Sequence, residues 1–301
     1  MPSVSSVEDA AAFFAAAHAD GRRARIGEDV TTERLNRILE HEAGDLTCTV
    51  EAGLRLSALQ AALGARGQRL SLDPPGDPTI GALLAENLSG PLRHRFGAPR
   101  DLVLGVTLVL GDGTIANAGG KVVKNVAGYD LARLVCGSRG RLAFIARASL
   151  RLHPLPTAAR TLVAAPEDVP AAVATLLRSQ LQPSALDVLH PGRVAVLFEG
   201  AERAVEAQLS RARTLIGGAE ASAEIWEESR TRQAAAGGRM RFDPGLLAAT
   251  LDDLSEAVVR PAAGVAYTQA PPSYKLSQGE EAVVRLVGRI TKELDPAGVL
   301  S

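Results

Sequence analysis

Glycine is concentrated in one short stretch of this chain of 301 residues, where Gly119, Gly120, Gly128, Gly137 and Gly140 lie close together. Glycine loses more conformational entropy on folding than any other residue, so a cluster of glycines needs a steric reason. The two usual reasons are a positive φ angle and the close approach of another group to the backbone. The stretch therefore predicts tight loops, and we expect these loops to contact a ligand.

Polar residues accompany these glycines. The segment from Gly137 to Gly140 is expected between a short helix and a long strand, where the backbone is open to a ligand. Lys121 and Lys124 either neutralise a phosphate group or are solvated loop charges. Asp130 is either part of the same polar site or the cap of the short helix.

A second segment of small residues spans residues 74 to 101. Its small side chains are Gly81, Ala82, Ala85, Ser89 and Gly90. Unpaired backbone N–H groups at the start of a helix bind anions, so this segment is either an anion site or a tight packing site of helix and loop. It matches neither the dinucleotide fingerprint nor the P-loop. Two such segments in one half of the chain indicate a large phosphate-bearing cofactor.

Charge and composition exclude several classes of protein. Hydrophobic residues make up 46% of the chain and charged residues 22%, and the formal net charge is -1, so no basic field predicts nucleic-acid binding. Cys48 and Cys136 are far apart, which predicts buried thiols in a reducing compartment. The first residues lack a secretory pattern, and no apolar run reaches the roughly 20 residues of a membrane span. We expect a cytoplasmic protein.

Hydrophobic spacing predicts an α+β protein of two domains. Helices are expected over residues 7–21, 31–45, 55–67 and 79–90, and a short strand over 22–27. Strands are expected over 46–53 and 141–153, with a hairpin over 101–118 that turns at Asp112-Gly113. Pro154 and Pro156 place a domain boundary between 1–156 and 157–301. In the second domain, strands and helices alternate, residues 232–245 are expected as a loop, and a helix is expected within 280–300.

Three segments carry a resemblance to a known family. Residues 79–105, 119–145 and 294–300 resemble the FAD-binding subunit of bacterial glycolate oxidase, in the vanillyl-alcohol oxidase or PCMH-type flavoprotein superfamily. The resemblance is dense over 46–156, and the sequence KNVAGYDL at 124–131 is its most specific part. It implies a PCMH-type FAD-binding domain of two α/β subdomains, followed by a smaller C-terminal α+β domain.

The same resemblance implies a function and partners. It implies flavin-mediated electron transfer, with non-covalent FAD, in a complex that oxidises small 2-hydroxy acids. A catalytic flavin subunit and an iron–sulfur subunit would be the partners, and they would hold the complex in the cytoplasm or peripherally at the inner membrane. A cofactor-free or weakly FAD-binding scaffold subunit of the same kind of complex is the alternative.

Candidate cofactor-binding residues follow from the resemblance by position. It implies that one group contacts the pyrophosphate and the flavin side, a second the ribityl, ribose and adenine portions, and a third the flavin pocket. The first group is Thr79, Ile80, Gly81, Asn87, Ser89 and Gly90, and Asp101 would close their loop; the second is Gly137, Ser138, Gly140, Leu142 and Ile145; the third is Lys124, Asn125, Gly128 and Tyr129.

The sequence departs from the family in its first loop. Relatives carry a glycine-rich pyrophosphate loop there, whereas this chain passes from Gly27 to Thr31 with Glu28 and Asp29 between them. Carboxylates beside a phosphate repel it, so we expect FAD binding to be weak, altered or lost.

The second departure concerns catalysis. Members of the superfamily that oxidise 2-hydroxy acids can carry a His-x-Gly-Asp-Gly-Asn metal motif, which this sequence lacks, so neither a metal site nor a catalytic residue is assigned. Its five histidines are isolated, and only His94, between Arg93 and Arg95, is a candidate for a test. We expect the isolated chain to be inactive.

Overall fold

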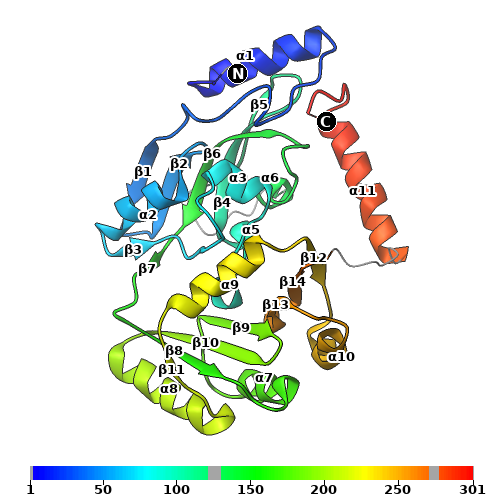
Figure 1. The fold of residues 1–301 in the computed structure, drawn as a ribbon. Coiled ribbons are helices and arrows are strands. Elements are labelled where there is room, and N and C mark those ends of the chain that lie inside the picture. Colours follow the sequence, from blue (N-terminus) through cyan, green and yellow to red (C-terminus); the bar gives the residue numbers. More distant parts are fainter. Residues whose placement is uncertain (1–2, 121–129, 271–277, 301) are drawn as a thin grey trace.

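The computed structural model describes residues 3–120, 130–270 and 278–300. The first unit is a five-stranded antiparallel sheet in the order β1-β2-β6-β4-β5 (Figure 1). Helices α2, α3 and α6 pack on one face of it around a large apolar cluster. The strands are β1 (Ile38–Glu42), β2 (Thr47–Glu51), β4 (Val103–Val109), β5 (Ile115–Gly119) and β6 (Phe144–Arg151), and the helices are α1 (Val7–Ala19), α2 (Leu56–Gly64), α3 (Ile80–Ala85), α4 (Arg93–Phe96), α5 (Pro99–Leu102) and α6 (Leu131–Val135).

The hairpin expected from sequence is present between β4 and β5. Gly113 has a φ of 86°, and its N–H donates to Leu110 O at 3.0 Å, while Leu110 N donates to Thr114 O at 2.9 Å. Only glycine adopts such a φ without strain, so the Asp112-Gly113 pair sets the register of the two strands.

Two local predictions in the first unit are wrong. The helix expected over 31–45 is replaced by strand β1, which pairs with β2 through His41 opposite Cys48. The spacing of Leu35, Ile38 and Leu39 suggested a helix, but β1 is an edge strand whose half-exposed residues carry little alternation. The short strand expected over 22–27 is a single β-bridge between Ile26 and Val30.

The second unit is a seven-stranded sheet in the order β11-β8-β10-β9-β13-β14-β12. Helices α7, α8 and α10 cover one face of this sheet, and α9 covers part of the other. These mixed layers confirm the predicted α+β class. The strands are β8 (Ala158–Ala164), β9 (Ala185–His190), β10 (Arg193–Gly200), β11 (Ala219–Ala221), β12 (Gly238–Arg241), β13 (Ala257–Arg260) and β14 (Val265–Thr268), and the helices are α7 (Val169–Arg178), α8 (Glu202–Ile216), α9 (Glu224–Ala234), η1 (Pro244–Leu246), α10 (Leu247–Asp252) and η2 (Pro261–Ala263).

The prediction of a loop over 232–245 is also wrong. Part of it is strand β12, in which Arg239 pairs with Tyr267 and Arg241 with Val265. Its Gly-Gly start and its polar residues resemble a loop, and only pairing with a distant strand makes this segment extended.

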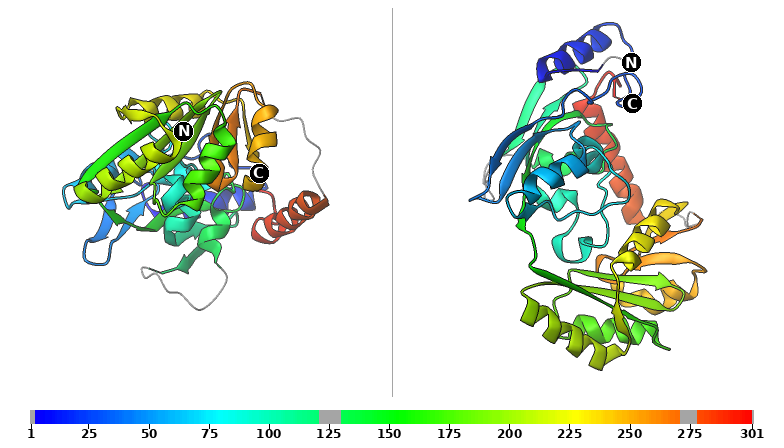
Figure 2. Two further views of the ribbon diagram at one scale, coloured as in Figure 1. Left: turned by 90° about the horizontal axis from the view of Figure 1, so that it is seen from below. Right: turned by 60° about the vertical axis from the view of Figure 1, so that its left-hand side comes forward.

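The end of the chain returns to the first unit (Figure 2). Helix α11 (Gln278–Leu294) packs through Ile290 and Leu294 against the first apolar cluster. The Asp295 carboxylate accepts hydrogen bonds from the N–H groups of Val299 and Leu300, which lie in a cluster with α1. A boundary at residue 156 stays a prediction, and residues 290–300 pack with the first unit.

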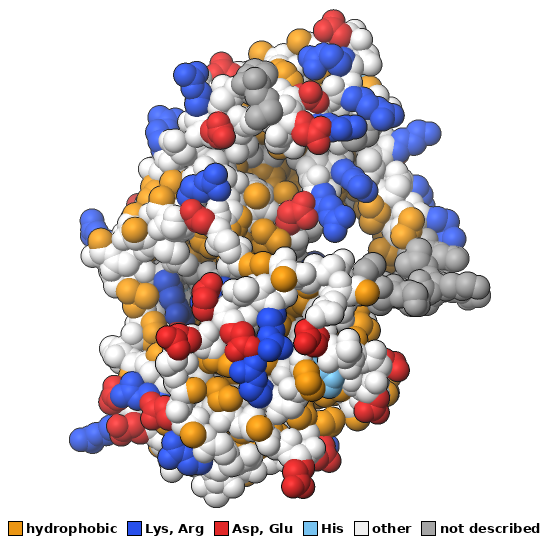
Figure 3. All heavy atoms as spheres, viewed as in Figure 1, with side chains coloured by type: hydrophobic (Ala, Val, Ile, Leu, Met, Phe, Trp, Pro, Cys, Tyr) orange, Lys and Arg blue, Asp and Glu red, His pale blue; other side chains and the backbone are white. Residues whose placement is uncertain are grey.

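A two-stranded pair of β3 (Gln68–Arg69) and β7 (His153–Pro154) lies in the first unit just before the chain enters the second, and ion pairs join the two units. Arg69 donates to both carboxylate oxygens of Glu199 at 2.6 and 2.7 Å. Basic and acidic side chains are interspersed over the visible face (Figure 3). Within the described ranges, no helix is long and apolar enough to cross a bilayer.

Candidate cofactor site

A cavity of about 350 Å³ lies where three segments of the first unit meet. The segments are the first loop after α1, helix α3 and the loop that leads into β6. The cavity is lined by Ile26, Gly27, Thr31, Thr32, Glu33, Arg55, Thr79, Gly81, Ala82, Ala85, Glu86, Arg139, Gly140, Ala143 and Ile145. Four of these, Thr79, Gly81, Gly140 and Ile145, were candidate residues.

The loop from Gly137 to Gly140 is held on the end of α3. Gly137 N donates to Leu84 O at 3.0 Å, and Arg139 N donates to Ala85 O at 2.9 Å. Gly137 and Gly140 have φ angles of 85° and 76°, which only glycine adopts readily. A Cβ on Gly140 would lie 3.2 Å from Ile26 Cδ1, so glycine keeps two walls of the cavity apart.

The start of α3 offers few donors to a phosphate. Ile80 N donates to Leu54 O at 2.9 Å, Gly81 N to Ala52 O at 2.6 Å, and Ala82 N to the capping hydroxyl of Thr79 at 3.2 Å. An N–H that is already bonded inside the protein gains little from an anion. Of the two alternatives for this helix start, the structure favours tight packing of helix and loop.

Two arginines supply positive charge at the cavity. Arg139 Nε lies 3.4 Å from Glu86 Oε2, in a largely exposed pair, and Arg55 Nη1 donates to the carbonyl of Asp77 at 2.8 Å. A guanidinium retains further donors when one is engaged, and its planar fork suits phosphate oxygens. The opposite wall is apolar, with Ala143 and Ile145 buried. Cations beside a small apolar wall fit a dinucleotide, whose phosphates are charged and whose rings are flat.

The carboxylates of the shortened loop do not line this cavity in the described structure. Glu28 pairs with Arg25 at 2.9 Å, and Asp29 Oδ2 accepts from Arg25 N at 2.8 Å. The expectation that both carboxylates stand where phosphates bind is therefore not supported. Glu33, which the sequence did not single out, lines the cavity instead.

The other candidate residues have different surroundings. Ile80 and Leu142 are buried in the core, Asp101 Oδ2 caps α5 through Ala98 N at 2.8 Å, and Asn87 Oδ1 accepts from Arg100 N at 3.3 Å. Asp130 caps α6 through Arg133 N. Ser138 Oγ, within the Gly137–Gly140 loop, is a buried atom without a hydrogen-bond partner in the described structure. Lys121, Lys124, Asn125, Gly128 and Tyr129 lie outside the described residues.

Two candidates lie at the junction with the second unit instead of the cavity. A Cβ on Gly90 would lie 1.8 Å from Asp73 O, so packing alone requires glycine there. The carbonyl of Ser89 accepts hydrogen bonds from Gln233 and Arg260 of the second unit. Their contact with FAD stays a prediction.

Sequence reasoning placed the family's pyrophosphate loop at Gly27 to Thr31 but named none of the lining residues from 26 to 33 as a candidate, and it missed Arg55. A signal was available at Gly53, whose Cβ would lie 1.9 Å from Thr32 O, since an isolated glycine after a strand indicates close backbone approach.

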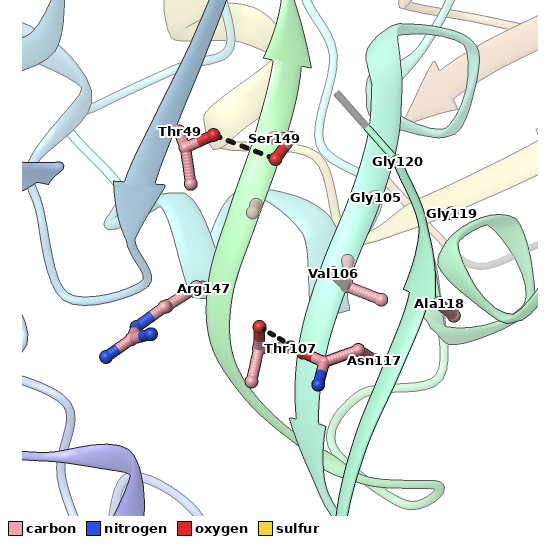
Figure 4. Close-up of a pocket in the computed structure, with 11 residues that line it drawn as sticks. Thr49, Gly105, Val106, Thr107, Asn117, Ala118, Gly119, Gly120, Arg147 and Ser149 are labelled. Atoms are coloured by element: carbon pink, nitrogen blue, oxygen red, sulfur yellow. Dashed lines mark hydrogen bonds between the residues drawn. The ribbon is translucent and has the colours of Figure 1, made fainter. Parts of the chain in front are cut away.

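A smaller hollow of about 140 Å³ lies on the open face of the first sheet (Figure 4). Thr49 and Ser149 share a hydrogen bond of 2.9 Å, and Thr107 Oγ1 donates to Asn117 Oδ1 at 2.8 Å. The Arg147 side chain extends away from β4 and β5. A Cβ on Gly119 would lie 2.2 Å from Leu104 O, so this glycine of the cluster serves strand packing.

The cysteines and His94 are not placed for catalysis at the cavity. Burial raises the pKa of both the Cys48 and the Cys136 thiol to about 12, so both stay protonated. His94 lies in a separate hollow beside Leu177 and Gln182, and burial lowers its pKa. Within the described ranges, no cluster of three His, Cys, Asp or Glu residues could hold a metal ion.

Comparisons with known proteins indicate an FAD-binding domain. The family model "FAD binding domain" matches residues 8–119. Over 221 residues the chain is 34% identical to "Glycolate oxidase subunit GlcE" of Escherichia coli. The aligned region covers 70% of this chain and 62% of that protein. The chain is 34% identical over 175 residues to "Glycolate oxidase subunit GlcD" of Bacillus subtilis, covering 56% of this chain and 37% of that protein.

The fold is similar to that of a solved alkyldihydroxyacetonephosphate synthase, with a TM-score of 0.73 at 15% identity over 99% of this chain and 74% of that one. The chain thus spans about 62% and 37% of the lengths of the two glycolate oxidase subunits. Residues 8–119 thus match an FAD binding domain, which supports FAD as the cofactor, and the fold is that of the solved synthase.

Proposed function

We propose that this chain is the FAD-binding subunit of a glycolate oxidase-like complex that oxidises small 2-hydroxy acids. The observation that carries the proposal is the cavity between the first loop, α3 and the Gly137–Gly140 loop, together with similarity to GlcE over 70% of the chain. FAD, when bound, supplies the redox chemistry, and the protein supplies binding and electrostatics.

The residues of the cavity have separate tasks in this proposal. Arg55 and Arg139 neutralise the pyrophosphate, and the Thr79 hydroxyl, which accepts from Ala82 N, keeps its hydrogen for donation. Gly140 leaves room for the adenosine half. Ala143 and Ile145 form an apolar wall that excludes water from the bound rings.

Partners complete the proposed complex. A catalytic flavin subunit and an iron–sulfur subunit would share the oxidation and the electron transfer, in the cytoplasm or peripherally at the inner membrane. Helix α11 supports assembly, because Val283, Val284, Leu286 and Val287 are each 50–59% exposed on it. Clustered exposed apolar side chains of this kind mark protein contacts.

FAD titration of the purified chain tests the proposal. We expect non-covalent, substoichiometric FAD after purification and measurable binding of added FAD, because the N–H groups at the start of α3 are engaged by the protein. The measurement is the absorption spectrum before and after addition, followed by quenching of flavin fluorescence. No binding at millimolar FAD would instead support a cofactor-free scaffold.

Turnover with an artificial electron acceptor is the second test. We expect the isolated chain not to oxidise glycolate, and activity to appear only when its partner subunits are added. Turnover by the chain alone, abolished by His94→Gln, would contradict the assignment as an accessory subunit.

A further inference from the structure

A buried polar network in the second unit ends on one carbonyl of the first unit. Arg260 is 1% exposed, and its Nε lies 3.3 Å from Oδ1 of the fully buried Asp187, whose Oδ2 accepts from Ser229 at 2.5 Å. Arg260 Nη2 donates to Gln233 Oε1 at 2.6 Å. Gln233 Nε2 and Arg260 Nη1 then donate to Ser89 O at 2.9 and 3.3 Å.

This carbonyl lies just beyond the helix that forms the cofactor wall. Helix α3 ends in a turn in which Asn87 N donates to Leu84 O and Leu88 N to Leu83 O, each at 3.0 Å. Asn87 has a φ of 51°, so the turn is a C-terminal cap in the left-handed conformation. Such a cap fixes the direction in which the chain leaves the helix, and the next residue is Ser89.

The same helix end holds the second wall of the cavity. Leu84 O and Ala85 O accept hydrogen bonds from Gly137 N and Arg139 N. An ion pair, hydrogen bonds and the backbone from Leu88 to Ser89 therefore connect Asp187 and Arg260 with the end of α3 and with the loop that carries Arg139 and Gly140.

We propose that Arg260 and Gln233 are positioning residues for the cofactor site: the second unit fixes the end of α3, and thereby the Gly137–Gly140 loop, without contacting FAD. A buried carbonyl with two donors has one stable position, because movement away would leave buried polar groups unpaired. The proposal rests on FAD occupying the cavity of the first unit.

Gln233→Glu isolates the contact with Ser89. The carboxylate keeps an acceptor for Arg260 but loses the N–H donor and sets a negative charge against the Ser89 carbonyl. Gln208→Glu is the matched control, since Gln208 uses only its oxygen, which accepts from Gln182 N at 2.8 Å on the far side of the unit. We expect the FAD dissociation constant, measured by fluorescence titration, to rise roughly 3- to 30-fold for Gln233→Glu and to stay unchanged for Gln208→Glu.

A second pair of variants distinguishes positioning of the cofactor site from a purely structural role in the second unit. Trp226→Phe removes the buried bond from Trp226 Nε1 to Thr161 Oγ1 at 2.9 Å and destabilises the same unit without touching Ser89. Arg260→Lys keeps the charge beside Asp187 but loses the planar fork. We expect Trp226→Phe to lower the urea midpoint with FAD affinity intact, and Arg260→Lys to weaken FAD binding at a similar midpoint.

Equal loss of FAD affinity in Trp226→Phe and Gln233→Glu, or unchanged affinity in folded Gln233→Glu, would overturn the proposal. If the proposed function itself were wrong, the unsubstituted chain would bind no FAD at all, so the two kinds of failure can be distinguished. Titration of that chain is therefore the first measurement of the series.

Discussion

The wall of the cofactor cavity consists mainly of small residues and exposed charges, whereas the junction between the two units consists of buried charged and amide side chains. At the cavity, Arg139 is 70% exposed and pairs with the half-exposed Glu86. At the junction, Arg260 and Asp187 are almost completely buried, and their neighbours supply further hydrogen bonds. The cavity therefore keeps donors for a ligand, while the junction uses its donors for the protein itself.

The same difference predicts how each region responds to substitution. Loss of an exposed pair changes stability little, since water replaces the partner. Loss of one member of a buried pair leaves a charge without compensation in a medium of low dielectric constant. Removal of a buried charge at the junction should therefore lower stability, whereas removal of an exposed charge at the cavity should alter FAD affinity with little effect on stability.

Arg260→Met should have the largest effect, because it leaves Asp187 buried without its counter-charge. We expect the free energy of unfolding to fall by about 3–5 kcal/mol, measured by urea denaturation. Arg193→Gln is the control, because Arg193 and its partner Glu228 are each about a third exposed. Similar losses for both variants would remove the distinction between a buried junction and an ordinary surface pair.

Two glycine substitutions compare the regions directly. In Gly90→Ala the new Cβ would meet the Asp73 carbonyl, so we expect a loss of about 1–3 kcal/mol in unfolding free energy.

In Gly140→Ala the new Cβ meets the flexible end of Ile26, and the φ of 76° adds strain of about 1 kcal/mol. A bulkier residue at Gly140 should lower FAD occupancy in a folded protein, measured by absorption. An FAD occupancy of folded Gly140→Leu equal to that of the parent chain would refute the cavity as the FAD site.

Local sequence predicted the cavity better than the junction. The glycines at 137 and 140 lie within one short motif, and their loop leads directly into β6. By contrast, Gln233 and Ser89 are 144 positions apart, and Arg260 and Ser89 are 171 apart. No periodicity links residues at such separations, so only the folded chain shows that they meet.

The fold shows the same limit. The hairpin, most helices and the core strands could be predicted from the hydrophobic periodicity and from turn residues, because those signals are local. Edge strand β1 and strand β12 did not, because their extended form depends on pairing partners, β2 and β14. The first loop was located by its resemblance to the family, but the helix expected from Thr31 onward concealed both β1 and the end of this wall.

The pH dependence of the free energy of unfolding tests the junction without removing a buried charge pair. Burial raises the pKa of Asp73 to about 7, against the opposing effects of its bond from Leu92 N and of the charges of Arg260 and Arg230. From about pH 4 to pH 7 only the folded protein keeps this proton, so stability should fall as pH rises, by up to ~1.4 kcal/mol per pH unit.

Asp73→Asn removes this titration. We expect the difference in unfolding free energy between the parent chain and the variant to change between pH 4 and 7 and to be constant above that range. A difference that is flat across the whole range would show that Asp73 has an ordinary pKa and that the junction is more hydrated than its packing indicates.

The smallest effect is expected at the shortened loop. Glu28 pairs with Arg25 on the surface, where the side chains are 66% and 60% exposed, so Glu28→Gln should change stability by less than ~1 kcal/mol. Because Glu28 is not among the described residues that line the cavity, the FAD dissociation constant of Glu28→Gln should stay within about twofold of the parent value.

Glu33→Gln is the matched comparison, since Glu33 lines the cavity, and loss of its charge should tighten FAD binding. Both constants come from the same fluorescence titration at low ionic strength, where charge effects are largest. Tighter binding in Glu28→Gln than in Glu33→Gln would mean that the shortened loop does repel the pyrophosphate, and that the first wall of the cavity approaches the phosphates through residue 28.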